Sequence, residues 1–433
     1  MEKRDSFFER FFGISQSGST MKIEVLAGIT TFITIAYILI LNPQILADPY
    51  VIMGDTVMAG KNSNCVFICT CIGAFIGTIL CALYAKVPFA QAPGMGLNAF
   101  FAYTVVLAMG YSYNQALVIV FISGIFFIVI TAVGLREAII RSIPDAVKMA
   151  ITPGIGLFIT IIGLKNSGLV VGNSATLVSM VDFAQWRSEG GDVSLICGAI
   201  VALIGLIVIG VLNARNVKGS IIIGILVATV AGIPLGVTKL SSFDMNLGTK
   251  FSDFAEVSLF KMDFAGLFAG ENIVSTIFTV IMLVLSFSLV NMFDSIGTLM
   301  GAARQSGMID ENGEIIHMKE ALMSDAISTA AGAMVGTSTV TTVVESSAGI
   351  AAGGRTGMTS LVTAVMFLAS IIFAPIVSIV PGQATAPALI FVGILMLSNI
   401  KEVDFSEMSN ALPACQHSVQ LYLCHSHILS QMV

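Results

Sequence analysis

The chain has 433 residues, of which 56% are hydrophobic and 11% charged, and its formal net charge is −6. Soluble domains carry about 25% charged residues, so this composition excludes an ordinary soluble protein and predicts an all-α polytopic membrane protein. No basic patch is available for a nucleic acid, and we expect no such partner. The lipid bilayer is the expected surrounding of most of the chain.

Apolar segments recur along the chain, most of them near the roughly 16–24 residues that a spanning helix needs. The ninth and tenth are short, which predicts broken or half-helices there. No low-complexity linker divides the series, so we expect a cytoplasmic N-terminus (1–23), one transmembrane domain of about twelve spans (24–400) and a short tail (401–433). The segments are 25–46, 66–85, 90–109, 116–133, 150–171, 195–211, 220–237, 274–300, 321–335, 340–352, 358–379 and 384–400.

The basic residues predict how the chain is oriented. Loops on the cytoplasmic side of a membrane protein are enriched in Lys and Arg. Basic residues precede the first segment and recur in every second connection after it, which predicts a cytoplasmic N-terminus in the bacterial cell membrane. Residues 139–151, with their charges and Pro144, are predicted to form an interfacial helix rather than a span. The residues that indicate this orientation are Lys3, Arg4, Arg10, Lys22, Lys86, Arg136, Arg141, Lys148, Arg215, Lys218, Arg304, Lys319, Arg355 and Lys401.

Two apolar stretches are interrupted by residues that break a regular helix. The first is QAPGMGLNAFFAY (91–103), in which Pro93, Gly94 and Gly96 are followed by the amide of Asn98. The second is GTSTVTTVVESSAGIAAGGRTG (336–357), whose β-branched run favours an extended backbone. Irregular backbone within a membrane is tolerated only where it is buried in protein or lines a cavity. Two such breaks in corresponding places predict a transporter's binding site.

Few ionisable residues fall within the spans, where they are usually functional. Asp294 and Glu345 are the main candidates, although either could simply bond to a neighbouring backbone group. Asp325 is predicted to cap the start of a helix. Asn98 could equally be a contact between helices or a ligand contact, and Arg355 is predicted to be an interfacial anchor.

Two carboxylates and an amide facing one cavity predict a small, neutral, hydrogen-bonding ligand. A buried carboxylate can also take up and release a proton, which suits proton-coupled transport. A membrane-embedded enzyme is a weaker alternative, because no span contains a His. We expect no cofactor and no metal, since the Cys65, Cys69 and Cys71 cluster has no accompanying His.

The chain resembles the AzgA-like adenine/guanine/hypoxanthine permeases of the nucleobase–cation symporter-2 family. Five stretches that together run from the first span to the eleventh carry this resemblance. They are AGITTFITIAYILILNP (27–43), QAPGMGLNAFFAY (91–103), TPGIGLFITIIGLKNSGLV (152–170), FDSIGTLMG (293–301) and GTSTVTTVVESSAGIAAGGRTGMT (336–359).

This resemblance implies fourteen spans in two inverted repeats of seven, with a core domain, a gate domain and short strands in spans 3 and 10. It implies import of purine nucleobases by proton symport through an elevator-type movement, and it leaves a homodimer open. The substrate positions fall on Asn98, Asp294 and Glu345. Glu345 would hold the ring N–H groups, Asp294 would assist or couple the proton, and Asn98 would shape the pocket.

The chain departs from the family pattern at two places. Asn291 stands where many relatives carry an acid. After Pro413 the sequence no longer resembles the last two gate spans, and a frameshift near residue 414 would explain their absence. The alternatives are therefore an inactive remnant of such a permease, or a transporter of the same fold for another nucleobase or an anion.

Overall fold

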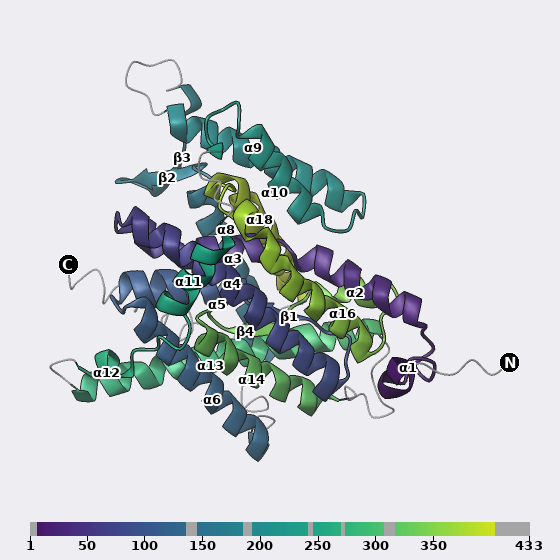
Figure 1. The fold of residues 1–433 in the computed structure, drawn as a ribbon. Helices are drawn as coiled ribbons and strands as arrows, with labels where there is room; N and C mark the ends of the chain where they lie inside the picture. Colours follow the sequence, from purple (N-terminus) through teal and green to yellow (C-terminus); the bar gives the residue numbers. More distant parts are fainter. Residues whose placement is uncertain are drawn as a thin grey trace.

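The computed structural model describes residues 7–135, 145–184, 193–240, 246–269, 273–306 and 317–402, and these ranges are built mainly from helices (Figure 1). Six helical stretches within them are long and apolar enough to cross a membrane, and four shorter apolar helices accompany these. The predicted all-α polytopic fold is therefore confirmed. The six are Met21–Ile52, Thr56–Ala85, Tyr113–Val133, Val193–Ala214, Ile273–Met300 and Gly357–Val377, and the four are Met95–Ala108, Ala150–Asn166, Ser220–Ala231 and Gly382–Leu397.

Every apolar segment predicted from the sequence contains helices or strands of the structure. The first half of the chain forms α1 (Phe7–Phe12), α2 (Met21–Ile35), α3 (Ile38–Ile52), α4 (Thr56–Leu80), the π-helix η1 (Cys81–Ala85), β1 (Gln91–Pro93), α5 (Met95–Ala99), the π-helix η2 (Phe100–Ala108), α6 (Tyr113–Val133), α8 (Asp145–Asn166), β2 (Val170–Asn173), β3 (Leu177–Met180) and α9 (Val193–Ala214).

The second half continues the same pattern. It forms α10 (Ser220–Ala231), α11 (Leu247–Val257), α12 (Phe264–Leu267), α13 (Ile273–Ser306), α14 (Met318–Val335), β4 (Val340–Thr342), α15 (Ser346–Ala351), α16 (Gly357–Ala369), the 3-10 helix η5 (Ser370–Phe373), α17 (Ala374–Val377), α18 (Gly382–Leu397) and the 3-10 helix η6 (Ser398–Glu402).

The two interrupted stretches meet in the structure. Strands β1 and β4 pair antiparallel, with Ala92 opposite Thr341, and both are fully buried. The Gly94 N–H donates to the Thr339 carbonyl (3.1 Å), and the Val343 N–H donates to the Ala90 carbonyl (3.2 Å). At each break, backbone N–H and C=O groups that would be paired within a regular helix are hydrogen-bonded to the other broken stretch. Apolar surroundings require such pairing. The strands predicted in spans 3 and 10 are confirmed.

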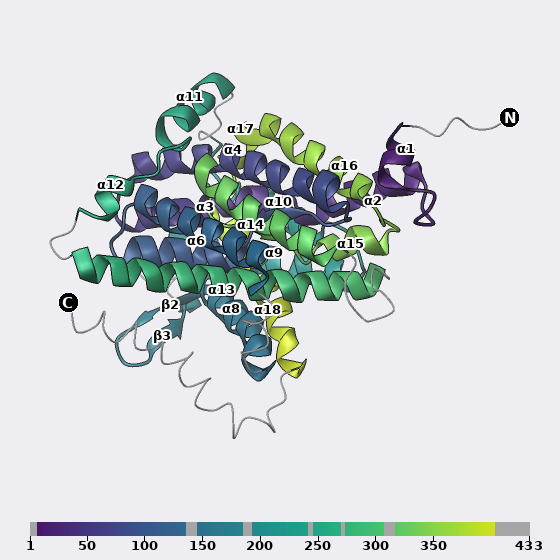
Figure 2. The ribbon, with the colours of Figure 1, turned by 90° about the horizontal axis from the view of Figure 1, so that it is seen from below.

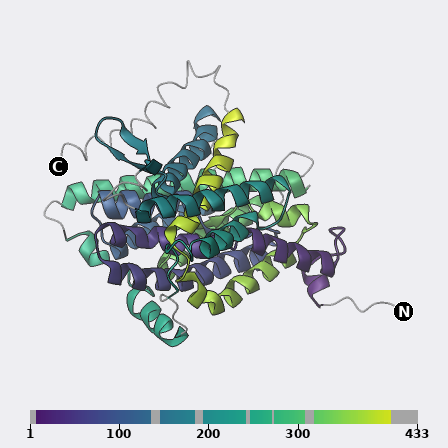
Figure 3. The same cartoon turned by 90° about the horizontal axis from the view of Figure 1, so that it is seen from above.

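The helices form two groups around this strand pair. Helices α8, α9, α10 and α18 pack on one another in the upper part of Figure 1, and we call them the first group. The second group contains α2, α3, α4, α6, α13, α14 and α16, together with the two broken spans. Figures 2 and 3 show α8 and α18 side by side and steeply inclined to the long helix α13. A cavity between the groups can therefore take side chains from both.

Two expectations about single elements are wrong. The ninth segment is no half-helix, because Lys319 and Glu320 lengthen it and α14 runs unbroken over 18 residues. The interfacial helix predicted over 139–151 is, from Asp145 onward, the first part of the long helix α8. The first part of that predicted helix, residues 139–144, lies outside the described ranges. The tail from residue 403 lies outside them as well, so the predicted loss of two spans stays a prediction.

Candidate functional site

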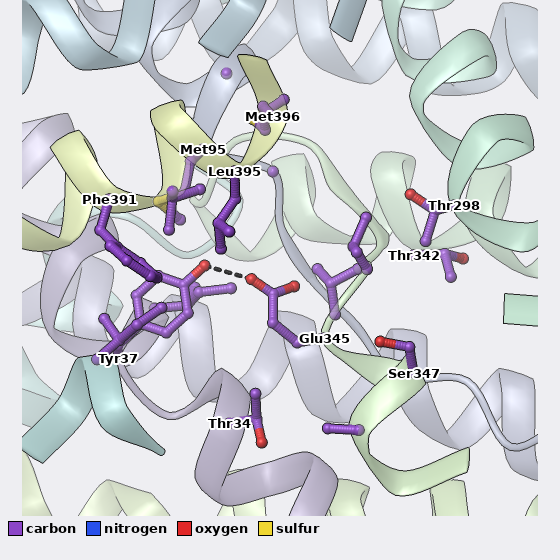
Figure 4. Close-up of a pocket in the computed structure, with 18 of the residues that line it drawn as sticks. Thr34, Tyr37, Met95, Thr298, Thr342, Glu345, Ser347, Phe391, Leu395 and Met396 are labelled. Carbon is purple, nitrogen blue, oxygen red and sulfur yellow. Dashed lines mark hydrogen bonds between the residues drawn. The ribbon is translucent and has the colours of Figure 1, made fainter. Parts of the chain in front are cut away.

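A cavity of about 390 Å³ lies where the broken spans face the first helix group. Small-molecule sites commonly have volumes of roughly 300–1,000 Å³. Its wall combines a few polar groups with aromatic and aliphatic side chains (Figure 4). The lining residues include Thr34, Tyr37, Met95, Asp294, Thr298, Thr342, Glu345, Ser347, Phe391, Leu395 and Met396.

Glu345 lies at the start of α15, three residues beyond strand β4. Its backbone carbonyl accepts from the Ala348 N–H (3.0 Å), which fixes the residue at the first turn. Its side chain lines the cavity, and Oε1 accepts from the Tyr37 hydroxyl at 2.6 Å (Figure 4). The break therefore aims a part-buried carboxylate into the cavity from a fixed backbone position.

Asp294 lines the same cavity from helix α13. Thr298, one turn further along α13, lines it as well. The neighbouring Ser295 faces away from the cavity and donates to Asp325 Oδ2 at 2.5 Å. The structure therefore brings two of the three predicted site residues, Asp294 and Glu345, to one cavity.

Asp325 does not cap a helix, and that prediction is wrong. It lies inside α14, where it is fully buried. Its Oδ1 accepts from the Thr342 N–H (2.6 Å) and the Thr342 hydroxyl (3.2 Å). Its Oδ2 accepts from Ser295 (2.5 Å) and, more weakly, from Thr341 (3.4 Å). One carboxylate therefore ties the strand that leads to Glu345 to the helix that carries Asp294.

Asn98 lies on α5, is fully buried and does not line the cavity. Its Nδ2 donates to Asn42 Oδ1 at 2.5 Å, and its Oδ1 accepts from the Ser338 hydroxyl. Asn42 in turn donates to Thr70 (2.8 Å) and Thr337 (3.0 Å). The amide thus links α3, α5 and the segment before β4, and its predicted substrate contact stays a prediction.

Two further residues of the sequence argument lie outside the cavity. Asn291 donates to the Thr329 hydroxyl (3.1 Å), and its Oδ1 has no partner among the described residues. Arg355 Nη1 donates to the carbonyls of Ile350 (2.7 Å) and Gly354 (2.8 Å). Arg355 therefore hydrogen-bonds backbone carbonyls at the C-terminal end of α15 and does not line the cavity.

The sequence argument missed Tyr37, the hydrogen-bond partner of Glu345. The residue lies in the turn between α2 and α3, within what the hydropathy pattern presents as one segment. Tyrosines of membrane proteins concentrate near the water interfaces. A tyrosine in the middle of an apolar run was the available signal, because a buried hydroxyl needs a partner.

The described residues offer no obvious place for a metal. Within them no three His, Cys, Asp or Glu side chains lie close enough together to hold an ion. Cys65, Cys69 and Cys71 are buried in α4, where Cys behaves as a small apolar residue. The polar side chains that line the cavity carry carboxylate, hydroxyl, amide and ammonium groups.

Comparison with known proteins identifies the chain. The profile of the Permease family matches residues 22–432. This chain belongs to the Permease family. It is 38% identical to the adenine permease AdeQ of Escherichia coli over 94% of this chain and 84% of that protein. It is also 38% identical to the guanine/hypoxanthine permease PbuO of Bacillus subtilis, over 93% of this chain and 87% of that protein.

Among solved structures, the permease resembles the transmembrane domain of the cyanobacterium bicarbonate transporter BicA. The TM-score is 0.58 at 15% sequence identity, over 87% of this chain and 89% of that domain. At this identity the likeness concerns the fold alone. The family resemblance drawn from the sequence motifs is confirmed, and the permease is a multi-pass membrane transporter rather than an enzyme.

Proposed function

We propose that this permease imports purine nucleobases by proton symport. Glu345 is the main ligand of the base and accepts its ring N–H groups. Asp294 binds or releases the coupled proton. The observation that carries the proposal is the Glu345 carboxylate, which the broken tenth span presents to a cavity of small-molecule size.

The chemistry of the cavity supports a planar, uncharged, hydrogen-bonding substrate. A carboxylate accepts hydrogen bonds from ring N–H groups. Phe391, Leu395 and Met95 supply apolar walls against which a flat ring can pack. Relatives named as adenine and guanine/hypoxanthine permeases are 38% identical to the chain over most of its length.

An anion is the weaker substrate. Transporter sites for anions direct helix N-termini or cationic groups at the ligand. Lys218 and the first turns of α5 and α15 also line this cavity, but the two carboxylates of Asp294 and Glu345 outweigh the one ammonium group and repel an anion. The fold likeness to a bicarbonate transporter therefore does not extend to the proposed substrate.

A cytoplasmic N-terminus also determines the side of the membrane to which the cavity opens. With that orientation the α9–α10 connection faces the cytoplasm, and Asn216 and Lys218 of this connection line the cavity. Polar contacts join the two helix groups on the opposite side, between Asn166 and Asp48 (3.2 Å) and between Gln44 and the Val380 carbonyl (2.8 Å). We infer an inward-facing state from which the second group, the core, moves past the first, the gate, as in an elevator.

Uptake measurements test the proposal. Cells lacking their own purine permeases are given this chain and labelled adenine, guanine or hypoxanthine, with and without a proton uncoupler. We expect uncoupler-sensitive accumulation of at least one base. Asp294→Asn should keep exchange of labelled for unlabelled base across the membrane but lose accumulation against a gradient. Accumulation by that variant would remove the proton role of Asp294, and protein inserted in the membrane that moves no purine would overturn the substrate assignment.

A further inference from the structure

Tyr37 holds a fixed position beside the carboxylate of the site. Its backbone carbonyl accepts from the N–H groups of Ile40 (3.1 Å) and Leu41 (3.0 Å), which begins helix α3. Its side chain is 1% exposed, and its hydroxyl oxygen lies 2.6 Å from Glu345 Oε1. Because backbone and packing both fix the ring, the hydroxyl stays next to the carboxylate while the cavity fills.

The two side chains together present three oxygens to a ligand. Figure 4 shows the Tyr37 hydroxyl and the two carboxylate oxygens of Glu345 in a row. A hydroxyl proton rotates to suit its partner, whereas an ionised carboxylate only accepts. When Tyr37 turns its proton from Glu345 to the ligand, the carboxylate draws back from the hydroxyl oxygen, since two oxygens 2.6 Å apart need a proton between them, and the row becomes one donor followed by two acceptors.

This row distinguishes the purine bases by the edge that carries positions 6, 1 and 2. Guanine offers a carbonyl, an N–H and an amino group there, which satisfies all three oxygens. Hypoxanthine offers the same first two groups and a C–H. Adenine places an amino donor against the hydroxyl and a bare ring nitrogen against a carboxylate oxygen. Xanthine places its second carbonyl against the last carboxylate oxygen, so that two acceptors face each other.

Resting on the proposed function, we propose that Tyr37 is a specificity-determining residue. With Glu345 it makes the permease select guanine first and hypoxanthine second, ahead of adenine and xanthine. The apolar wall does not make this choice, because Phe391 can stack on any base and stacking tolerates every base. Sites built to hydrogen-bond a polar group discriminate strongly against analogues that leave it unpaired.

Competition measurements test this assignment. Uptake of labelled guanine is inhibited by unlabelled guanine, hypoxanthine, adenine and xanthine in the parent chain, Tyr37→Phe and Tyr113→Phe. The control also loses a buried tyrosine hydroxyl, which donates to the Gly336 carbonyl (2.8 Å) away from the cavity. Ratios of inhibition constants do not depend on how much protein reaches the membrane. A variant that does not transport is assayed by displacement of labelled guanine from purified protein.

We expect the parent to rank the bases in the proposed order. Tyr37→Phe should weaken guanine and hypoxanthine about tenfold, because the base carbonyl loses its donor, and should weaken adenine less, because the adenine amino group loses one acceptor but keeps the neighbouring carboxylate. The control should keep the parent's order. Adenine inhibiting the parent as strongly as guanine, or an unchanged guanine-to-adenine ratio in Tyr37→Phe, overturns the specificity role and leaves purine transport standing. Failure of the parent to bind or move any of the four bases overturns both proposals.

Discussion

At the scale of residues, two acids in and beside the tenth span have different surroundings, one part-buried at the cavity and one fully buried. Glu345 faces the cavity and keeps an oxygen for a ligand, since only its Oε1 is bonded to Tyr37. Asp325 is fully buried and holds the strand before Glu345 in place. Both are carboxylates within helical spans, but one lines the cavity, where we propose that it binds the base, and the other bonds only to protein groups that position it.

Glu345→Gln should raise the KM for purine uptake about hundredfold. The amide keeps the shape of the side chain but replaces one acceptor with a donor, which opposes the N–H groups of the base. The measurement is the concentration dependence of uptake, with membrane insertion checked in parallel. Glu320→Gln, on the half-exposed first turn of α14, should stay within about twofold of the parent. An unchanged KM in Glu345→Gln would remove Glu345 from the substrate site.

Asp325→Asn should lower the free energy of unfolding by about 3 kcal/mol. The asparagine amide presents a donor where the Thr342 N–H or the Ser295 hydroxyl donates, and a buried donor is left unpaired. Thermal unfolding of the purified protein measures this loss. Asp182→Asn is the matched control, because Asp182 is exposed and, within the described ranges, accepts from the Ala184 N–H (2.9 Å). Equal unfolding temperatures for the two variants would contradict an anchoring role for Asp325.

At the scale of elements, the site depends on the two broken spans and on a close helix pair. The β1–β4 pair satisfies the backbone where the helices stop, so the spans can end in mid-membrane. In the first group, α8 and α18 approach closely at Gly156 and Gly393. A Cβ on Gly156 would come within 2.6 Å of the Gly393 carbonyl oxygen. Small residues at this crossing allow the backbones to meet, as is common between helices in membranes.

Gly156→Val should therefore separate α8 from α18 and reduce transport at least about tenfold. The cause is overpacking against backbone, which a flexible neighbour cannot relieve. The expected result is a lower unfolding temperature together with slower uptake per inserted molecule. Gly210→Val on α9 introduces the same side chain where a Cβ would meet nothing within 4 Å, and it should behave like the parent. Similar losses in both variants would attribute the effect to helix propensity instead of the crossing.

At the scale of the whole molecule, polar contacts join the two helix groups on one side. On the other side the cavity lies between the groups. Asn166 of α8 donates to Asp48 (3.2 Å) and to the Tyr103 hydroxyl (3.3 Å), both in the core. Gln44 of the core donates to the Val380 carbonyl and accepts from Thr385 on α18. In the proposed inward-facing arrangement these contacts would hold the outer side closed, and they would have to break before the cavity opens outward.

Accessibility of a cysteine in the cavity tests this arrangement. Val344→Cys puts a thiol on an exposed cavity residue, and a membrane-impermeant maleimide should label it faster in inside-out than in right-side-out vesicles. Adding Asn166→Leu removes two hydrogen bonds that hold the outer side closed, so the ratio of the two rates should fall about tenfold. Labelling of the parent chain's own cysteines is measured separately and subtracted. Asn173→Leu, on the exposed β2–β3 hairpin, is the control substitution and should leave the ratio of labelling rates unchanged. Faster labelling from the outside in Val344→Cys alone would reverse the inferred orientation or state.

By itself, the sequence determined the membrane class, the apolar segments, the two breaks and the family, and it singled out Asp294 and Glu345, which the structure places at one cavity. These features can be read from short stretches of sequence. A span in lipid needs a long apolar run, so a helix-breaking residue or a charge within such a run stands out. Only the tertiary structure decided that Asn98 and Asp325 bond other protein groups, that Tyr37 meets Glu345 and that the helices divide into two groups. Tyr37 and Glu345 are 308 residues apart, and which distant groups satisfy a buried polar side chain depends on how the spans pack.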